Sequence, residues 1–130
     1  MIIVTGGAGF IGSNVIAALN ERGRQDIILC DSLGSDDKWR NLNGKSIIDV
    51  ISPADLSSLM QSGSLGSYEG KIEAVFHLGA NSSTVETDVD ALLTENFRYS
   101  CDLWRTCASK GIRLIYASSA ATYGNGSVGF

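Results

Sequence analysis

Glycines near the N-terminus have the spacing of a phosphate-binding loop. Residues 7–12 (Gly-Ala-Gly-Phe-Ile-Gly) match the pattern GxGxxG, and Gly6, Gly9 and Gly12 also match GxxGxxG. The run follows four apolar residues and precedes a helical pattern, which is the context in which such glycines let the backbone approach a pyrophosphate. A glycine-rich turn without a ligand is the alternative. The flanking elements favour a dinucleotide-binding loop.

An acidic residue follows the second apolar run at the distance expected of a ribose ligand. Asp31 comes directly after residues 27–30 and lies 19 positions beyond Gly12. In Rossmann-type domains, an acid about 20 residues after the glycines hydrogen-bonds the adenosine ribose. Such a carboxylate usually favours an unphosphorylated ribose. Lys38 and Arg40 follow within one loop, however, and they could neutralise a 2′-phosphate or be solvated surface cations.

Polar residues also mark two later apolar runs. Ser118 and Ser119 follow residues 112–117, and His77 lies within residues 74–78. Because ligands bind outside the carboxyl ends of parallel strands, the serines are candidate site residues rather than polar residues that only close a strand. His77 is expected to be a buried, hydrogen-bonded histidine rather than a catalytic one. With one histidine and three cysteines without CxxC spacing, no metal site is expected.

Short β-rich runs alternate with helical patterns along the chain, which predicts a parallel sheet flanked by helices. The expected strands are residues 1–4, 27–30, 46–50, 74–78 and 112–117, and the expected helices are 9–21, 53–60 and 91–110. Ser52 is the expected N-cap of the second helix, and Gly111 the residue that ends the third. Residues 32–43, with one helical turn near 38–41, and residues 63–70 are expected loops. The fold class is therefore α/β, a Rossmann-type doubly wound parallel sheet of five strands.

The composition limits the classes of partner. The chain has 130 residues and is 44% hydrophobic, which suits one domain with one core. Its net charge of −4 argues against nucleic acid as a partner. No apolar run approaches the ~20 residues that cross a bilayer, so no membrane partner is expected. An odd number of cysteines without a disulfide pattern predicts a reduced, cytoplasmic location.

Four segments resemble motifs of the extended short-chain dehydrogenases/reductases. They are Thr-Gly-Gly-Ala-Gly-Phe-Ile-Gly (5–12), His-Leu-Gly-Ala (77–80), Asn-Phe-Arg-Tyr-Ser (96–100) and Tyr-Ala-Ser-Ser-Ala-Ala-Thr-Tyr-Gly (116–124). Within this superfamily, residues 76–84, Asp31-Ser32-Leu33 with Lys38, and residues 118–124 are most similar to the ADP-L-glycero-D-manno-heptose 6-epimerase family. The resemblance extends over essentially the whole chain.

The resemblance implies the cofactor-binding portion of an NADP-dependent epimerase, with NAD as a possible cofactor. Such an enzyme transiently oxidises C6 of a nucleotide-linked heptose during lipopolysaccharide inner-core synthesis, as a homo-oligomer. The implied cofactor-binding residues are Gly6, Gly9, Phe10, Ile11 and Gly12 at the pyrophosphate, Asp31, Ser32 and Lys38 at the ribose, Leu78, Gly79, Ala80, Asn81 and Ser82 beneath the centre of the cofactor, and Asn96 as support for that wall. Ser119 aligns with the catalytic serine that hydrogen-bonds the reacting sugar oxygen.

The sequence departs from this family in two respects. The family uses a Tyr-x-x-x-Lys pair as acid/base and cofactor ligand, and no tyrosine of these 130 residues has lysine four positions later. We therefore expect residues 1–130 to be a truncated NAD(P)-binding Rossmann domain without a substrate domain, with an exposed sheet edge that promotes association. Pro53 stands where related enzymes tend to carry a lysine near the cofactor.

Two alternatives stay open. An NAD-dependent UDP-hexose 4-epimerase or nucleotide-sugar dehydratase fits Asp31 and Pro53. A dinucleotide-binding fragment without catalytic activity fits the missing Tyr-x-x-x-Lys pair.

Overall fold

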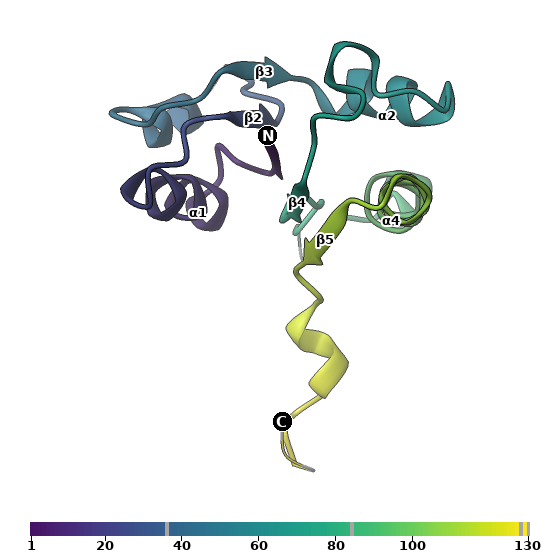
Figure 1. Ribbon diagram of the computed structural model, residues 1–130. Coiled ribbons are helices and arrows are strands. Elements are labelled where there is room, and N and C mark those ends of the chain that lie inside the picture. The colour runs from purple at the N-terminus through teal and green to yellow at the C-terminus, as the bar shows by residue number, and fades with distance from the viewer. Residues whose placement is uncertain (36, 84, 128, 130) are drawn as a thin grey trace.

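Five short parallel strands form one sheet at the centre of the molecule (Figure 1). The computed structural model describes residues 1–35, 37–83, 85–127 and 129; Thr84, which ends the segment 76–84 quoted above, lies outside them. The strands are β1 (Ile2–Thr5), β2 (Ile27–Cys30), β3 (Asp49–Ile51), β4 (Ala74–His77) and β5 (Arg113–Tyr116). Their order is β3-β2-β1-β4-β5. From β1 the chain adds β2 and β3 on one side, and it then adds β4 and β5 on the other side of β1. This reversal of the strand order creates a topological switch point at the carboxyl ends of β1 and β4.

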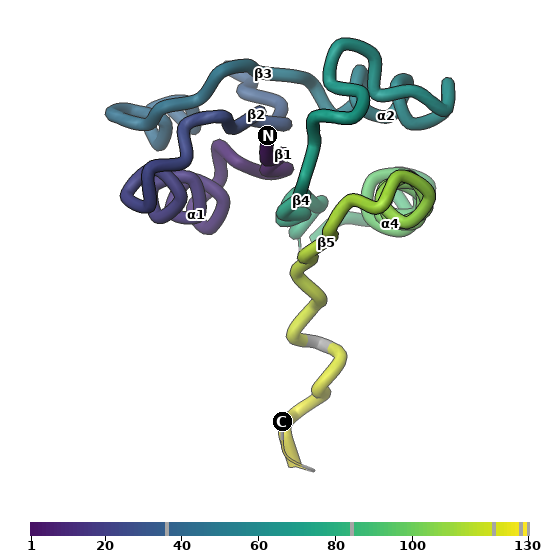
Figure 2. The backbone as a smooth tube through the Cα atoms, viewed as in Figure 1, coloured from purple at the N-terminus to yellow at the C-terminus, as the bar shows by residue number. Residues whose placement is uncertain are grey.

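Helices cover both faces of the sheet. They are α1 (Phe10–Glu21), α2 (Pro53–Gln61), α3 (Val89–Leu92) and α4 (Tyr99–Lys110), with a π-helical segment η3 (Leu93–Arg98) between the last two. Shorter 3-10 turns are η1 (Asp37–Leu42), η2 (Gly66–Tyr68) and η4 (Ala120–Tyr123). Figure 2 shows α1 on one side of the sheet and both α2 and α4 on the other. The predicted doubly wound α/β class is confirmed.

Alternate side chains of each central strand enter two separate cores, because successive residues of a strand point to opposite faces. On the α1 face, Val4 and Leu29 pack in one buried cluster with Ile16 of α1. On the other face, Ile3 and Ile28 belong to a cluster that α2 and α4 complete; its helical members include Leu56, Met60, Leu103 and Cys107. Both faces of β1 and β2 are therefore buried, as in other parallel sheets.

The predicted start of α2 and the predicted end of α4 are confirmed by their caps. Ser52 Oγ accepts a hydrogen bond from the Asp55 backbone N–H at 3.0 Å, and Pro53 occupies the first turn of α2, where no N–H donor is needed. Gly111 ends α4 in the left-handed conformation with φ of 67°. Asp88 Oδ1 accepts from the Ala91 N–H and caps α3.

The third strand is displaced from the predicted residues 46–50. It covers Asp49–Ile51, since its length and register depend on its neighbour β2. The Ile48 N–H donates to the Ile27 carbonyl where pairing begins, and the Asp31 N–H donates to the Ile51 carbonyl where it ends. Ile47, inside the predicted strand, instead packs against the core on the α1 face.

The predicted helix 91–110 is present as α3, η3 and α4, but it is not α-helical throughout. Residues 93–98 are π-helical, a geometry that is rare and often found at functional sites. Leu103 and Cys107 of α4 are buried, whereas Phe97 and Trp104 are 64% and 61% exposed. The chain after β5 leads away from the sheet (Figure 1). Of the helices within the described ranges, none is long and apolar enough to cross a membrane.

Candidate functional site

The glycine-rich loop joins β1 to α1 at the switch point of the sheet. Gly6 has φ of +65°, and a Cβ there would lie 2.7 Å from the Cα of Gly79. A Cβ on Gly12 would lie 2.1 Å from the Gly6 carbonyl oxygen, so neither position has room for a side chain. At Gly9, a Cβ would meet the Gly6 oxygen at 3.2 Å, and this side of the loop is open. Gly6, Gly9 and Gly12 therefore match the roles of tight turn, ligand approach and helix packing.

The N-terminus of α1 begins at this open side. Gly9 is the N-cap of α1, and no side chain among the described residues caps it. The first N–H groups of a helix lack partners inside the helix, and together with the helix dipole they favour an anion such as phosphate. Phe10 and Ile11 form the first turn and are 82% and 63% exposed. They lie beside this N-terminus rather than in the core.

Asp31 connects the glycine loop to the loop after β2. Its side chain is buried, and Oδ2 accepts a hydrogen bond from the Ala8 N–H at 2.8 Å. Its Oδ1 accepts from the Ser32 N–H at 2.8 Å and forms an ion pair with Lys38 Nζ at 2.5 Å. Asn41 adds a second connection by donating to the Ala8 carbonyl at 2.9 Å. The carboxylate at the end of β2 is therefore charge-paired and shapes the glycine loop.

Thirteen of the fourteen predicted cofactor-binding residues line one cleft of about 1230 Å³. They are Gly6, Gly9, Phe10, Ile11, Gly12, Asp31, Ser32, Lys38, Leu78, Gly79, Ala80, Asn81 and Ser82. The volume exceeds that of a typical drug-sized pocket, which suits a dinucleotide. Pro53 also lines the cleft, as do Thr5 and Arg98, which were not predicted. Arg98 lies inside the quoted segment 96–100, so that segment was the available signal.

The loop after β4 forms the opposite wall of this cleft, and hydrogen bonds hold it at both ends. Thr5 Oγ1 accepts from the backbone N–H groups of Leu78 at 3.1 Å and Gly79 at 3.0 Å. At the other end, Asn96 Oδ1 accepts from the Asn81 N–H at 2.7 Å, and Asn96 Nδ2 donates to the Asn81 carbonyl at 2.9 Å. Asn96 thus contacts the wall itself and lies behind the cleft.

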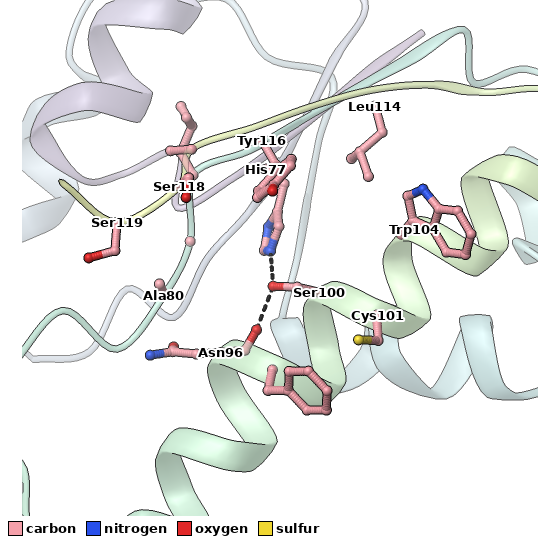
Figure 3. A pocket seen from close by; sticks show the side chains of 14 residues that line it. His77, Ala80, Asn96, Ser100, Cys101, Trp104, Leu114, Tyr116, Ser118 and Ser119 are labelled. Carbon is pink, nitrogen blue, oxygen red and sulfur yellow. Dashed lines mark hydrogen bonds between the residues drawn. The ribbon is translucent and has the colours of Figure 1, made fainter. Parts of the chain in front are cut away.

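A second cavity of about 540 Å³ adjoins the cleft (Figure 3). Asn96, Ser118 and Ser119 line it together with His77 and Trp104, and Leu78, Gly79 and Ala80 border both cavities. Ser119 is exposed just beyond the carboxyl end of β5. The structure therefore brings the predicted cofactor residues together and places Ser119 and Asn96 around the neighbouring cavity.

His77 is buried between the two ends of the wall, as predicted for a hydrogen-bonded histidine. Its Nδ1 lies 2.7 Å from Thr5 Oγ1 and its Nε2 lies 2.8 Å from Ser100 Oγ (Figure 3). Burial lowers the pKa of His77. Burial also raises the pKa of the Tyr99 phenol, and it raises that of the Cys30 thiol to about 11. Within the described ranges, no three His, Cys, Asp or Glu side chains are grouped so that they could hold a metal ion.

Comparisons with known proteins agree with this geometry. Residues 2–129 match the family described as "NAD dependent epimerase/dehydratase family". The ADP-L-glycero-D-manno-heptose-6-epimerase of Fusobacterium nucleatum is 48% identical over 130 residues, which are 100% of this chain and 38% of that protein. The chain therefore spans well under half the length of this relative.

Two solved structures have the same fold. The crystal structure of the Helicobacter pylori ADP-L-glycero-D-manno-heptose-6-epimerase is 29% identical with a TM-score of 0.70, and the match covers 95% of this chain and 40% of that one. The Bacillus cereus UDP-glucuronic acid 4-epimerase in complex with NAD is 25% identical with a TM-score of 0.73, and the match covers 95% and 41% of the two chains.

Proposed function

Because the chain belongs to the NAD dependent epimerase/dehydratase family, we propose that it is the cofactor-binding portion of an ADP-L-glycero-D-manno-heptose 6-epimerase. The observation that carries the proposal is the single cleft that gathers the glycine loop, Asp31 and the loop after β4. The 48% identity to a relative of that name supports the choice of substrate. The setting that goes with it is lipopolysaccharide inner-core synthesis in the cytoplasm, by a homo-oligomer.

The residues present fit a nicotinamide dinucleotide. The open side of Gly9 and the N-terminus of α1 would hold the pyrophosphate, and Asp31, Ser32 and Lys38 would meet the adenosine ribose. Residues 78–82 would support the centre of the cofactor. When bound, the cofactor supplies hydride removal and return at C6 of the heptose. Ser119, at the end of β5, would orient the reacting sugar oxygen by a hydrogen bond.

NADP is the cofactor we propose, and the ion pair between Lys38 and Asp31 supports it. An unpaired carboxylate at this position would repel a 2′-phosphate, but Lys38 Nζ lies 2.5 Å from Asp31 Oδ1 and neutralises it. A second candidate is an NAD-dependent nucleotide-sugar epimerase or dehydratase. Pro53 favours this candidate, because it lines the same cleft with a side chain that can neither donate a hydrogen bond nor carry a charge.

Titration of the chain with NADP⁺ and NAD⁺ separates these candidates. Lys38→Ala removes the ammonium group that would bind the 2′-phosphate of NADP⁺, and a charge-assisted hydrogen bond of this kind is worth about 1.5–3 kcal/mol. NADP⁺ affinity should therefore fall by roughly tenfold or more, while the affinity for NAD⁺, which lacks this phosphate, changes less. Lys45→Ala is the matched control, since Lys45 is a lysine outside the cleft. Tighter binding of NAD⁺ than of NADP⁺ by the unmodified chain would refute the NADP assignment, and failure to bind either would refute the dinucleotide site.

Catalysis is tested with ADP-D-glycero-D-manno-heptose and NADP⁺. Because no Tyr-x-x-x-Lys pair occurs in these 130 residues, we expect the chain alone to bind cofactor without forming epimerised product. Product formed by the 130 residues alone would contradict this division between binding and catalysis.

A further inference from the structure

The Thr5 hydroxyl determines which nitrogen of His77 carries the proton. A hydroxyl has one hydrogen to donate and two lone pairs that accept. Thr5 Oγ1 already accepts from the N–H groups of Leu78 and Gly79 at 3.1 and 3.0 Å. Its hydrogen is therefore donated to His77 Nδ1, which lies 2.7 Å away. Nδ1 is an acceptor in this arrangement, so the neutral ring carries its hydrogen on Nε2.

The same direction continues on the other side of the ring. Nε2 donates to Ser100 Oγ at 2.8 Å, and Ser100 Oγ in turn donates to the Asn96 carbonyl at 2.5 Å, as the dashed lines in Figure 3 show. The Asn96 side chain holds both backbone groups of Asn81. A single chain of hydrogen bonds thus joins the two anchors of residues 78–81, the wall shared by the cleft and the adjoining cavity.

We propose that His77 is a positioning residue whose neutral Nε2–H form holds residues 78–81 in place for the dinucleotide, so that protonation of the ring weakens cofactor binding. A proton on Nδ1 would face the Thr5 hydroxyl, which would have to turn a lone pair toward it. Thr5 would then lose one of its two bonds to the N–H groups of the wall. The proposal rests on the proposed dinucleotide function, since it concerns the wall of that cleft.

The surroundings of the ring place its protonation below the ordinary histidine pKa of 6.5. Tyr99 of α4 lies 5.7 Å from His77 between ring centroids, with Cys30 of β2 behind it, 3.6 Å from the Tyr99 hydroxyl. Tyr116 is the register partner of His77 on β5, and Cys101 lines the same cavity. These neighbours are phenols and thiols, which are ordinarily uncharged below pH 7. None of them is a carboxylate that would favour the protonated ring. Burial lowers the pKa of His77 from 6.5, and its protonation occurs below that pH.

The ring is directly observable, because His77 is the only histidine in the sequence. In the ¹⁵N-labelled chain without a histidine tag, two-bond ¹H–¹⁵N spectra at pH 7.5 should show the Nε2–H tautomer. Affinity for NADP⁺ should fall progressively as the pH is lowered from 7.5 through and below 6.5, the ordinary pKa of histidine. In His77→Gln, whose amide stays neutral, this part of the pH dependence should disappear.

Serine variants separate positioning from general stability. Ser100→Ala removes the acceptor for Nε2–H and should weaken NADP⁺ binding several-fold at pH 7.5. Ser109→Ala, on the same helix and also bonded to a backbone carbonyl, at 3.0 Å, should leave binding unchanged. If His77→Gln fails to fold, as judged by circular dichroism, the tautomer and the serine pair still decide the question.

Each failure has its own meaning. An Nδ1–H tautomer would overturn the proposal, and so would an equal pH dependence in the unmodified chain and a folded His77→Gln. Equal binding by Ser100→Ala and Ser109→Ala would also overturn it. Absence of dinucleotide binding at every pH would instead refute the proposed function. Amide hydrogen exchange at Leu78 and Gly79 measures how firmly the wall is held, and Thr5→Val should accelerate it because the Thr5 hydroxyl no longer accepts from these N–H groups.

Discussion

The contact between Gly12 and Gly6 predicts a large loss of stability when Gly12 is replaced by alanine. The added Cβ would lie 2.1 Å from the Gly6 oxygen, about 0.9 Å short of the 3.0 Å that real contacts respect. Both partners are backbone, so no side chain can rotate away. Gly6 is also confined from the other side, because a Cβ built on it would lie 2.7 Å from the Gly79 Cα. The strain must therefore be relieved by moving α1 or the glycine loop.

The size of the effect follows from two opposing contributions. Overpacking costs about 1–3 kcal/mol, and a backbone contact belongs at the upper end of that range. Alanine in a helix gains up to about 1 kcal/mol over glycine. We therefore expect the free energy of unfolding to fall by about 2 kcal/mol, which lowers the urea midpoint by roughly 1 M. A midpoint equal to that of the unmodified chain would refute the packing argument.

Gly9→Ala is the matched control, because Gly9 has an ordinary φ of −71° and a Cβ there would meet the Gly6 oxygen at 3.2 Å instead of 2.1 Å. Replacing glycine by alanine at an N-cap costs at most about 1 kcal/mol, so this variant should stay folded. Its methyl group would lie where the backbone must approach the pyrophosphate, so NADP⁺ affinity should fall about tenfold. Unchanged affinity in Gly9→Ala would contradict the assignment of the phosphate site without affecting the prediction for Gly12.

Three further measurements test other parts of the structure. Ser52→Ala should lower the free energy of unfolding by about 1 kcal/mol in urea titrations, because the N–H of Asp55 loses its cap; no change would show that solvent replaces it. Because burial lowers the pKa of His77, the unfolded chain binds a proton that the folded chain does not, and the free energy of unfolding should fall as the pH drops below about 6.5. His77→Gln should remove this pH dependence, and an equal pH dependence in that variant would refute its origin in His77. Exposed Phe97 and Trp104, with the open edge of β5, should cause concentration-dependent association in sedimentation experiments; Trp104→Ser should reduce it, and a monodisperse unmodified chain would contradict the prediction.

Features that depend on neighbouring residues in the sequence could be predicted. Ser52 followed by Pro53, and Gly111 after a helical pattern, mark helix ends because capping involves residues a few positions apart. The limits of β3 could not be predicted, since they follow from its pairing with β2. The π-helical residues 93–98 were also beyond prediction, because the apolar pattern of the helix does not show where one turn gains a residue.

The site shows the same division between local and long-range information. Its residues could be placed together because parallel strands end at one edge of the sheet, and the cleft gathers thirteen of them. Their partners could not be predicted. Asp31 was expected at the ribose, and in the structure its carboxylate also accepts from the Ala8 N–H and pairs with Lys38. An acid at the end of β2 therefore does not by itself exclude a 2′-phosphate, since its charge is already compensated.

The segments 77–80 and 96–100, which the sequence presents as separate motifs, are one structural unit. The hydrogen bond from His77 to Ser100 joins them across 23 positions, and Asn96 closes the connection at Asn81. Thr5 adds the end of β1 to the same unit. A histidine in the first segment therefore needs a hydrogen-bond acceptor in the second, which the Ser100 hydroxyl supplies, because a buried imidazole N–H without an acceptor is costly. On this reasoning Ser100→Thr should preserve cofactor binding where Ser100→Ala does not.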